Sequence, residues 1–155
     1  YTTLVKFGFA SGAYRADPAD GLVLRDCMIT NAVRCVPPEN KPLPVEIRTC
    51  NRFLASQISM MPRLSAIITL GRVAHDAALA AFAARRSAYS FAHGSKHEVG
   101  SVAIINSYHC SRYNTNTGVL TPAMFEAVFD MARAALGPTG RVSERDDICS
   151  DGDRD

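Results

Sequence analysis

The sequence has 155 residues, of which 47% are hydrophobic and 21% are charged, and its formal net charge is +2 at pH 7. These values are ordinary for one soluble globular domain with a real core. No apolar run approaches the roughly 20 residues that span a bilayer, and no signal peptide is visible, so the sequence argues against a membrane-spanning or secreted protein.

The cysteines indicate the cellular compartment of the protein, and the distribution of charge indicates a tail and a kind of partner. The five cysteines are an odd number, and without a secretory context they do not indicate a disulfide framework. We therefore expect a reducing compartment, the cytoplasm. Six acidic and three basic residues follow Gly137, so residues 137–155 are expected to form a disordered acidic tail. The mildly basic body, residues 1–136, is compatible with binding phosphate backbones.

The first third of the chain is predicted to contain the end of a helix, a strand and a proline-rich loop. Residues 1–10 have an apolar helical pattern, and because Tyr1 rather than Met opens it, we expect the sequence to begin inside a domain. Residues 11–21 are rich in turn formers. A buried strand is predicted within residues 22–33, and four prolines exclude regular structure from residues 36–44.

Two strand–helix units follow the proline-rich loop. Pro44 suits the first turn of a helix. Residues 64–70 form a short apolar run typical of a strand, and Gly71 turns it into an Ala-rich helix over residues 72–84. The buried face of the first helix is marked by apolar residues at three- and four-residue steps. These are Ile47, Cys50, Leu54, Ile58 and Met61.

The last part of the chain repeats the strand–helix pattern. Residues 85–100 are predicted to be a loop that contains His93-Gly94, and residues 101–107 a buried strand. A polar loop, Tyr108 to Gly118, comes next. Thr121-Pro122 begins a helix with a hydroxyl cap and a proline in the first turn, and Gly137 ends it.

Alternating apolar strands and helices indicate an α/β fold, a three-layer α/β/α sandwich around a short parallel sheet covered on both faces. In such sheets, ligands bind beyond the carboxyl ends of the strands. Asn31, Gly71 and His109 each follow a predicted strand end. The architecture therefore predicts that these three residues share one rim of the sheet.

The polar loop from Tyr108 to Gly118 is the best candidate for a functional segment. It is dense in hydrogen-bonding side chains, and long loops of this kind in compact domains are usually functional. A histidine at the strand exit, His109, followed by the pair Arg112-Tyr113, is an unusual choice for a plain linker. The alternative is a solvated connector.

Three further residues have both a functional and a structural interpretation. Cys35 and Cys50 frame the proline-rich loop and could be ligands to zinc or an iron–sulfur cluster, or simply buried thiols. Asn31 carries an acceptor and a donor on one planar group, which suits recognition of a pyrimidine edge, but asparagine is also a common turn former.

Three segments together resemble the iron–sulfur branch of the uracil-DNA glycosylase superfamily, most closely family 5. ITNAVRCVPPENKPLPVEIRTC resembles the family's strand, ligand loop and following helix. LSAIITLGRVAHDAAL resembles its next strand–turn–helix unit. INSYHCSRYNTNTGVLTPAMF resembles its terminal histidine motif, DNA-inserting loop and last helix. The similarity covers about residues 1–136.

The resemblance implies an enzyme that cleaves the N-glycosidic bond of a damaged base in DNA, chiefly uracil, after the base has left the helix stack. Asn31 would hydrogen-bond the uracil edge. His109 would face the base carbonyl that gains negative charge as the bond breaks. The loop that follows would enter the DNA duplex. Its expected DNA contacts are Ser111, Arg112, Tyr113 and Asn114.

The resemblance also implies a cofactor and a monomeric enzyme. Cys35 and Cys50 would be two of the four ligands of a structural [4Fe–4S] cluster. The family's first central strand, its base-cupping loop and two further cysteines would precede Tyr1, so this chain alone is expected to be poorly stable and inactive. The family usually has proline after the motif histidine, where this sequence has Cys110, and often a hydroxyl cap where it has Leu43.

Two other hypotheses fit parts of the sequence. One is a non-catalytic nucleic-acid-binding or protein-binding module that keeps the fold, which Cys110 and the missing first motif favour. The other is a zinc- or cluster-binding redox protein that does not bind DNA, which leaves the Tyr108–Gly118 loop unexplained. Steep weakening of binding with salt would separate a DNA-binding protein from the redox protein.

Overall fold

The computed structural model describes residues 1–34 and 43–137. Cys35, the proline-rich loop and the acidic tail beyond Gly137 lie outside the described residues. The elements, in chain order, are α1 (Thr2–Lys6), β1 (Ala10–Ser11), β2 (Val23–Leu24), α2 (Pro44–Ser59), β3 (Ala66–Leu70), α3 (Arg72–Ala81), the 3-10 helix η2 (Arg86–Ala88), β4 (Lys96–Val99), β5 (Val102–Ser107), α4 (Arg112–Asn116) and α5 (Pro122–Leu136). Among these elements, no helix is both long and apolar enough to cross a membrane.

A three-stranded sheet with the order β3-β5-β4 forms the middle layer. β3 and β5 are parallel, with Ile67 opposite Ile104, while β4 runs antiparallel to β5. β5 has a strand on each side, and all of its residues are buried. The other edge of β3 has no partner strand within residues 1–34 and 43–137.

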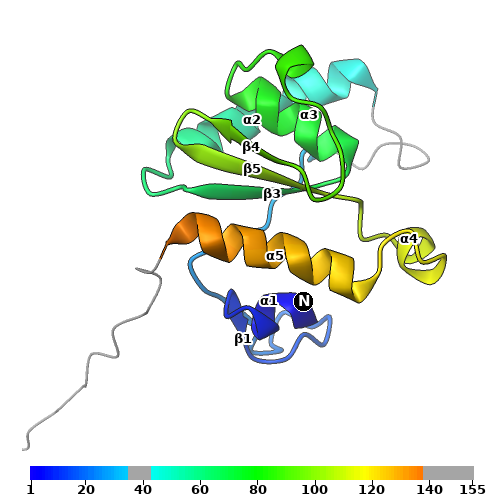
Figure 1. The fold of residues 1–155 in the computed structure, drawn as a ribbon. Coiled ribbons are helices and arrows are strands. Elements are labelled where there is room, and N and C mark those ends of the chain that lie inside the picture. Colours follow the sequence, from blue (N-terminus) through cyan, green and yellow to red (C-terminus); the bar gives the residue numbers. More distant parts are fainter. Residues whose placement is uncertain (35–42, 138–155) are drawn as a thin grey trace, which may run out of the picture.

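Helices cover both faces of this sheet (Figure 1). α2 and α3 pack against each other on one face, and α5 lies along the other. Consecutive side chains of a strand point to opposite faces, so Ile104 packs with Leu79 of α3 while Ile105 packs with Val128 of α5. All four side chains are fully buried, and each contributes roughly 1.5–3 kcal/mol through burial. The predicted α/β fold is thus confirmed.

The N-terminal residues pack on the outer side of α5 (Figure 1). The carbonyl of Phe7 accepts a hydrogen bond from Nε of Arg133 at 2.8 Å, and the same guanidinium lies 4.3 Å from the centre of the Phe9 ring. Lys6 and Glu126 form an ion pair at 2.7 Å. These contacts fix the short α1 and the β1–β2 ribbon to the outer side of the last helix.

Three sequence predictions need correction. Only Val23–Leu24 of the strand predicted within residues 22–33 is a strand, and it pairs with β1 rather than joining the main sheet. A strand needs a partner edge, and here Met28 and Ile29 are 47% and 51% exposed. The predicted loop 85–100 contains η2 and the antiparallel β4, so the sheet is mixed. The predicted loop Tyr108–Gly118 contains α4.

The other predicted elements are present, two of them with different ends: the helix expected over residues 1–10 is limited to Thr2–Lys6, and the one expected over residues 72–84 ends at Ala81. α2 begins at Pro44, where Glu46 accepts a hydrogen bond from the backbone N–H of Leu43 at 2.7 Å; this is one half of a capping box, and the half that a hydroxyl would supply is missing at Leu43. α5 begins after Thr121, whose hydroxyl accepts from the backbone N–H of Met124, and ends at Gly137 with a φ of 69°. The cap at Thr121 and the end at Gly137 are what the sequence indicated.

Candidate active site

The carboxyl ends of the two parallel strands bring Gly71 and His109 together. The backbone N–H of Gly71 donates to the carbonyl of Ser107 at 2.8 Å, which ties the end of β3 to the end of β5. Gly71 has a φ of +88°, and a Cβ built on it would lie 3.3 Å from the Cβ of His109. A glycine is therefore required beside His109. The prediction that these two residues share a rim is confirmed.

The connection after His109 is held by its own side chains. The amide of Asn114 donates to the carbonyl of His109 at 2.8 Å, and the hydroxyl of Ser111 caps α4 by accepting from the backbone N–H of Asn114. The backbone carbonyl of Asn114 accepts from Leu120, which is buried. Ser111 and Asn114, two of the expected DNA contacts, thus also shape the connection.

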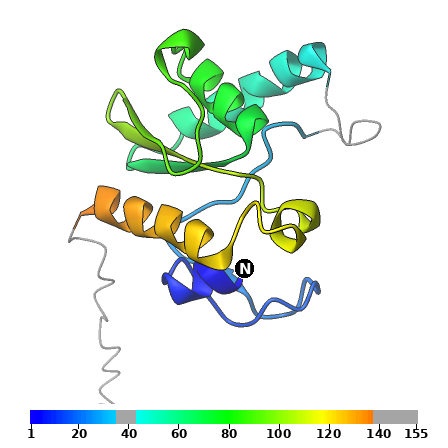
Figure 2. The same ribbon diagram turned by 45° about the vertical axis from the view of Figure 1, so that its right-hand side comes forward.

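Two side chains of α4 stay available on its surface. Within the described residues, Arg112 and Tyr113 form no side-chain hydrogen bond or ion pair, and Tyr113 is 74% exposed. α4 projects from one end of the molecule, beyond the layers of the sandwich (Figures 1 and 2). A charged and an aromatic side chain on a projecting turn are suited to contact a phosphate and a base.

A buried polar network lies directly beneath this rim. Oδ1 of Asn106 accepts hydrogen bonds from the hydroxyl of Thr69 at 2.5 Å and from Nδ1 of His75 at 2.8 Å. The amide nitrogen of Asn106 donates to the hydroxyl of Ser95 at 2.9 Å, and Nε2 of His75 lies 3.0 Å from the carbonyl oxygen of Tyr89. Every buried side-chain polar atom of the described residues has a partner, so this network fixes the strand end.

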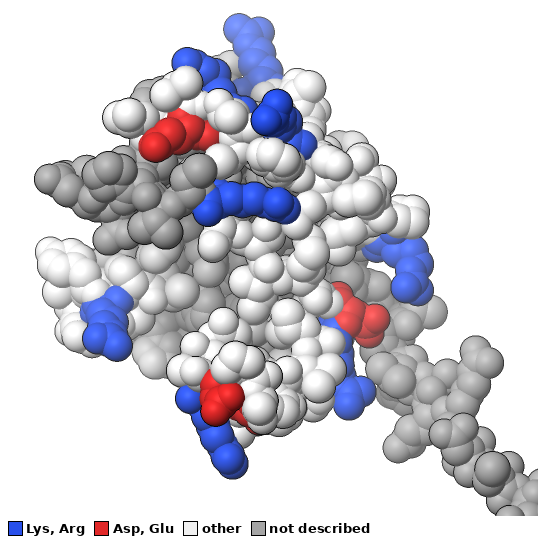
Figure 3. Space-filling view, turned by 180° about the vertical axis from the view of Figure 1, so that it is seen from behind, with Lys and Arg blue, Asp and Glu red and all other residues white. Residues whose placement is uncertain are grey.

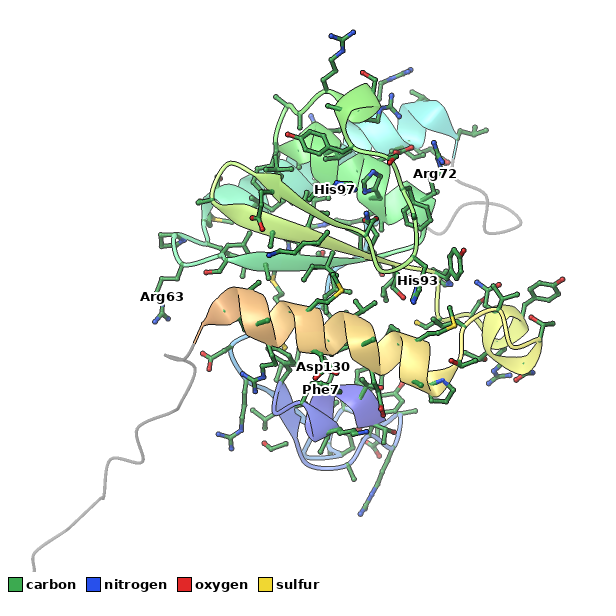
Figure 4. The ribbon with its side chains drawn as sticks, viewed as in Figure 1. Phe7, Arg63, Arg72, His93, His97 and Asp130 are labelled. Atoms are coloured by element: carbon green, nitrogen blue, oxygen red, sulfur yellow. The ribbon has the colours of Figure 1, made fainter. Side chains whose placement is uncertain are left out.

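The same network holds a second histidine at the rim. The carbonyl of Asn106 accepts from the backbone N–H of Gly94, and Nδ1 of His93 accepts from the backbone N–H of Tyr108 at 3.1 Å. The rings of His93 and Tyr108 stack with centres 4.9 Å apart. Figure 4 shows His93 at the end of the molecule where β5 leads toward α4. With Nδ1 as acceptor, the neutral ring carries its proton on Nε2.

Sequence reasoning gave these network residues little weight. His75 lies on α3 and is 1% exposed, and its place on an Ala-rich helix gives no sign of a partner in this network. The signal that could have found the network is Asn106 itself, a lone amide inside the apolar run SVAIINS, because a buried amide must find partners. The second signal is the glycine that follows His93, because glycine marks a turn. In the structure Gly94 has a φ of +74°.

Asn31 does not join this cluster of contacts. It is exposed, it follows no strand of the main sheet, and within the described residues its side chain forms no hydrogen bond. The hydroxyl of its neighbour Thr30 donates to Oε1 of Gln57 at 3.1 Å, which attaches this segment to α2. The expectation that Asn31 ends a strand of the same sheet is therefore wrong, because residues 25–34 do not pair with β3.

The cysteines divide into different environments. Cys50 is 5% exposed on α2, and Cys35 lies outside the described residues. The thiol of Cys27 donates to the carbonyl of Phe9 at 3.2 Å, and burial raises its pKa, which fits a structural role. Within the described residues no group of three or more His, Cys, Asp or Glu is placed to hold a metal ion. A four-thiolate site is thus not completed by them.

The sequence is similar to known proteins over most of its length. The model of the Uracil DNA glycosylase superfamily matches residues 4–133. A Type-5 uracil-DNA glycosylase from Thermus thermophilus is 42% identical over 121 residues, which are 77% of this chain and 55% of the relative. One from Mycobacterium bovis is 36% identical over 140 residues, 88% of this chain and 52% of the relative. One from Pyrobaculum aerophilum is 33% identical over 137 residues, 88% of this chain and 59% of the relative. The chain spans about half the length of these relatives.

Proposed function

The chain belongs to the uracil DNA glycosylase superfamily, and on that premise we propose that the protein containing it removes uracil from DNA, as a monomer, by hydrolysing the bond between base and sugar. Residues 1–136 would form the C-terminal part of one glycosylase domain. The observation that carries the proposal is the rim at the ends of β3 and β5, where His109 lies against Gly71 and the chain continues into the projecting α4.

In this proposal α4 holds the DNA while the base is outside the helix. Extruding a base costs a few kcal/mol of lost stacking and pairing. Tyr113, exposed on α4, would stack in the vacated site, which is worth about 1–3 kcal/mol per base. Arg112 and Ser111 would contact backbone phosphates, and Asn114 would keep the turn in shape through its bond to the carbonyl of His109.

His109 would stabilise the leaving group. As the bond between the sugar carbon and the base nitrogen breaks, its electron pair moves into the base, and negative charge grows on the base carbonyl. A ring N–H of His109 would donate to that oxygen, and water would attack the oxocarbenium-like sugar. Asn31 would select uracil by offering a donor and an acceptor to its edge. Preorganised donors of this kind act most strongly where water is excluded.

The cofactor belongs to the same proposal. Cys35 and Cys50 would be two of four thiolate ligands of a [4Fe–4S] cluster, with the others supplied from outside the described residues. The bound cluster would fix the geometry of the proline-rich loop. Acid-labile sulfide and iron in the purified protein, lost in Cys50→Ser but retained in Cys27→Ser, would support this assignment. Equal iron content in the two variants would contradict it.

Replacement of His109 and Asn31 tests the site directly. Removing one preorganised donor costs roughly 10²–10³-fold in rate, so His109→Ala and Asn31→Ala in the natural full-length protein should excise uracil that much more slowly while still binding DNA. His97→Gln is the matched control, because Nε2 of His97 bonds the carbonyl of Ser90, and Figure 4 shows it away from His93. If both alanine variants excise uracil at the normal rate, the assignment of His109 and Asn31 to the active site is wrong.

A second candidate function is DNA binding without catalysis. It is favoured by Cys110, which is exposed and leaves the connection after His109 without the stiffness of proline. Incubation with uracil-containing DNA followed by alkali separates the two functions, because only a glycosylase leaves abasic sites that alkali cleaves. A protein that binds this DNA and leaves it uncut is the binding module.

A further inference from the structure

Two arginines share one exposed aromatic ring on the surface of α2. The Cζ atoms of Arg34 and Arg52 lie 5.1 Å and 5.0 Å from the centre of the Phe53 ring, which is 41% exposed. Arg52 and Phe53 belong to α2, and Arg34 comes from the segment that carries Asn31. We call Arg34, Arg52 and Phe53 the arginine–phenylalanine cluster.

The positive charge of this cluster is uncompensated. Within the described residues no ion pair includes Arg34 or Arg52. Glu46 is the only acidic residue of α2, and its carboxylate accepts the hydrogen bond from Leu43 at the start of that helix. Arg48, one turn before Arg52, adds a further exposed positive charge. Two guanidiniums on one ring repel each other, so an anion between or beside them would relieve that repulsion.

The cluster lies on a basic part of the surface. Figure 3, which views the molecule from behind, shows Lys and Arg side chains gathered over the upper part, where Figure 1 places α2. α2 begins at the same end of the molecule from which α4 projects, in both ribbon views. A DNA strand bound at α4 and continuing past the site would run toward the start of α2, from which Arg52 and Phe53 lie about two turns along the helix.

We propose that the arginine–phenylalanine cluster is a second contact for DNA, one that binds the sugar–phosphate backbone beside the extruded base. The guanidinium fork matches phosphate oxygens in a way that a lysine ammonium does not. Stacking on Phe53 holds both forks in place before DNA arrives, which lowers the entropic cost of binding. This inference rests on the proposed function for the identity of the ligand as DNA.

The salt dependence of DNA binding tests the proposal without requiring catalysis. The affinity of the natural full-length protein for a uracil-free DNA duplex would be measured by fluorescence anisotropy over a range of salt. Each lost phosphate contact lowers the slope of log K against log salt by about 0.9. Arg34→Ala combined with Arg52→Ala should lower that slope by about 1.8, and at 0.1 M salt each substitution should weaken binding on the order of tenfold.

Two further variants separate the cluster from general charge. Arg63→Ala is the matched control, because Figure 4 shows Arg63 at the opposite end of the sheet, and it should leave the slope unchanged. Phe53→Leu keeps both charges but removes the ring. It should therefore weaken DNA binding while the slope of log K against log salt stays close to that of the unchanged protein. Circular dichroism and thermal unfolding would confirm that each variant is folded.

The outcomes test this inference and the proposed function separately. If the double variant and Arg63→Ala have the same slope and affinity, the cluster does not bind DNA. A larger loss of binding to poly-glutamate than to DNA would also overturn the proposal, since the partner would then be an acidic protein. A normal slope with normal uracil excision refutes this inference alone. A reduced slope in a protein that excises no uracil refutes the proposed function alone.

Discussion

Gly71→Ala is the sharpest test of the rim geometry. Gly71 has a φ of +88° and a ψ of 166°, a backbone region that is essentially restricted to glycine and costs other residues roughly 1–3 kcal/mol, so unfolding should occur several degrees lower. The new Cβ would also lie 3.3 Å from the Cβ and 3.8 Å from Cδ2 of His109, and the histidine must give by a few tenths of an ångström. A misplacement of about 1 Å can cost 10²-fold in rate, so excision should fall roughly 10- to 100-fold.

The assay is single-turnover excision of uracil under saturating enzyme, together with thermal unfolding. Gly100→Ala is the matched control, because Gly100 has a φ of +62° in the turn between β4 and β5, and a Cβ added there would meet nothing within 4 Å. It should also lose stability, because its positive φ disfavours alanine, but it should lose no activity. If the two variants lose the same activity, strain rather than the contact with His109 explains the effect, and the reasoning fails.

Three further changes have definite expected outcomes. Asn106→Leu should lower the free energy of unfolding by about 1–3 kcal/mol in urea, because His75 and Thr69 lose their shared partner, and an unchanged midpoint would contradict the network. Asn114→Ala should weaken DNA binding with little effect on unfolding, because it releases the exposed turn from His109; equal affinity would show that the turn holds itself. Burial raises the pKa of the Cys27 thiol, so the folded state keeps that proton to higher pH than the unfolded chain does. Stability should then fall as pH rises above about 9, and iodoacetamide should modify Cys27 more slowly than an exposed cysteine; equal rates in peptide mapping would refute its burial.

The long elements of the fold were predictable because their signals are local. α2 and α5 each have a proline in the first turn and an apolar face at helical spacing, and Gly137 ends α5 as expected. β3 and β5 are apolar runs of the right length. Each of these elements carries in its own residues the information that determines it.

The elements that were missed depend on partners or on single hydrogen bonds. β4 has the half-exposed alternation of an edge strand, with Lys96 and Glu98 exposed, and it is a strand only because β5 offers an edge. α4 is polar throughout and is held by the cap at Ser111. Residues 25–33 have a strand-like sequence but no neighbour in the main sheet, so Met28 and Ile29 stay exposed.

Part of the candidate site was also predictable. That His109 and Gly71 meet follows from parallel strands that end at the same edge. The hydrogen-bonded network beneath them, which links Asn106 to His75, joins residues far apart in sequence. No rule of residue spacing predicts such a contact. The structure of residues 1–34 and 43–137 does not decide the role of Asn31. Nor does it decide whether Cys35 and Cys50 bind one cluster, so both stay predictions.

Within residues 1–34 and 43–137 one edge of β3 has no partner strand, and this has a consequence for the behaviour of the isolated chain in solution. The backbone N–H and C=O groups of that edge form a ready template for another extended segment, and the residues of this strand are mostly only half-buried. Handled by itself at high concentration, the chain should self-associate edge to edge and bind dyes that report aggregation. A further segment that paired with this edge of β3 would suppress the self-association. It would raise solubility even where it left catalysis unchanged.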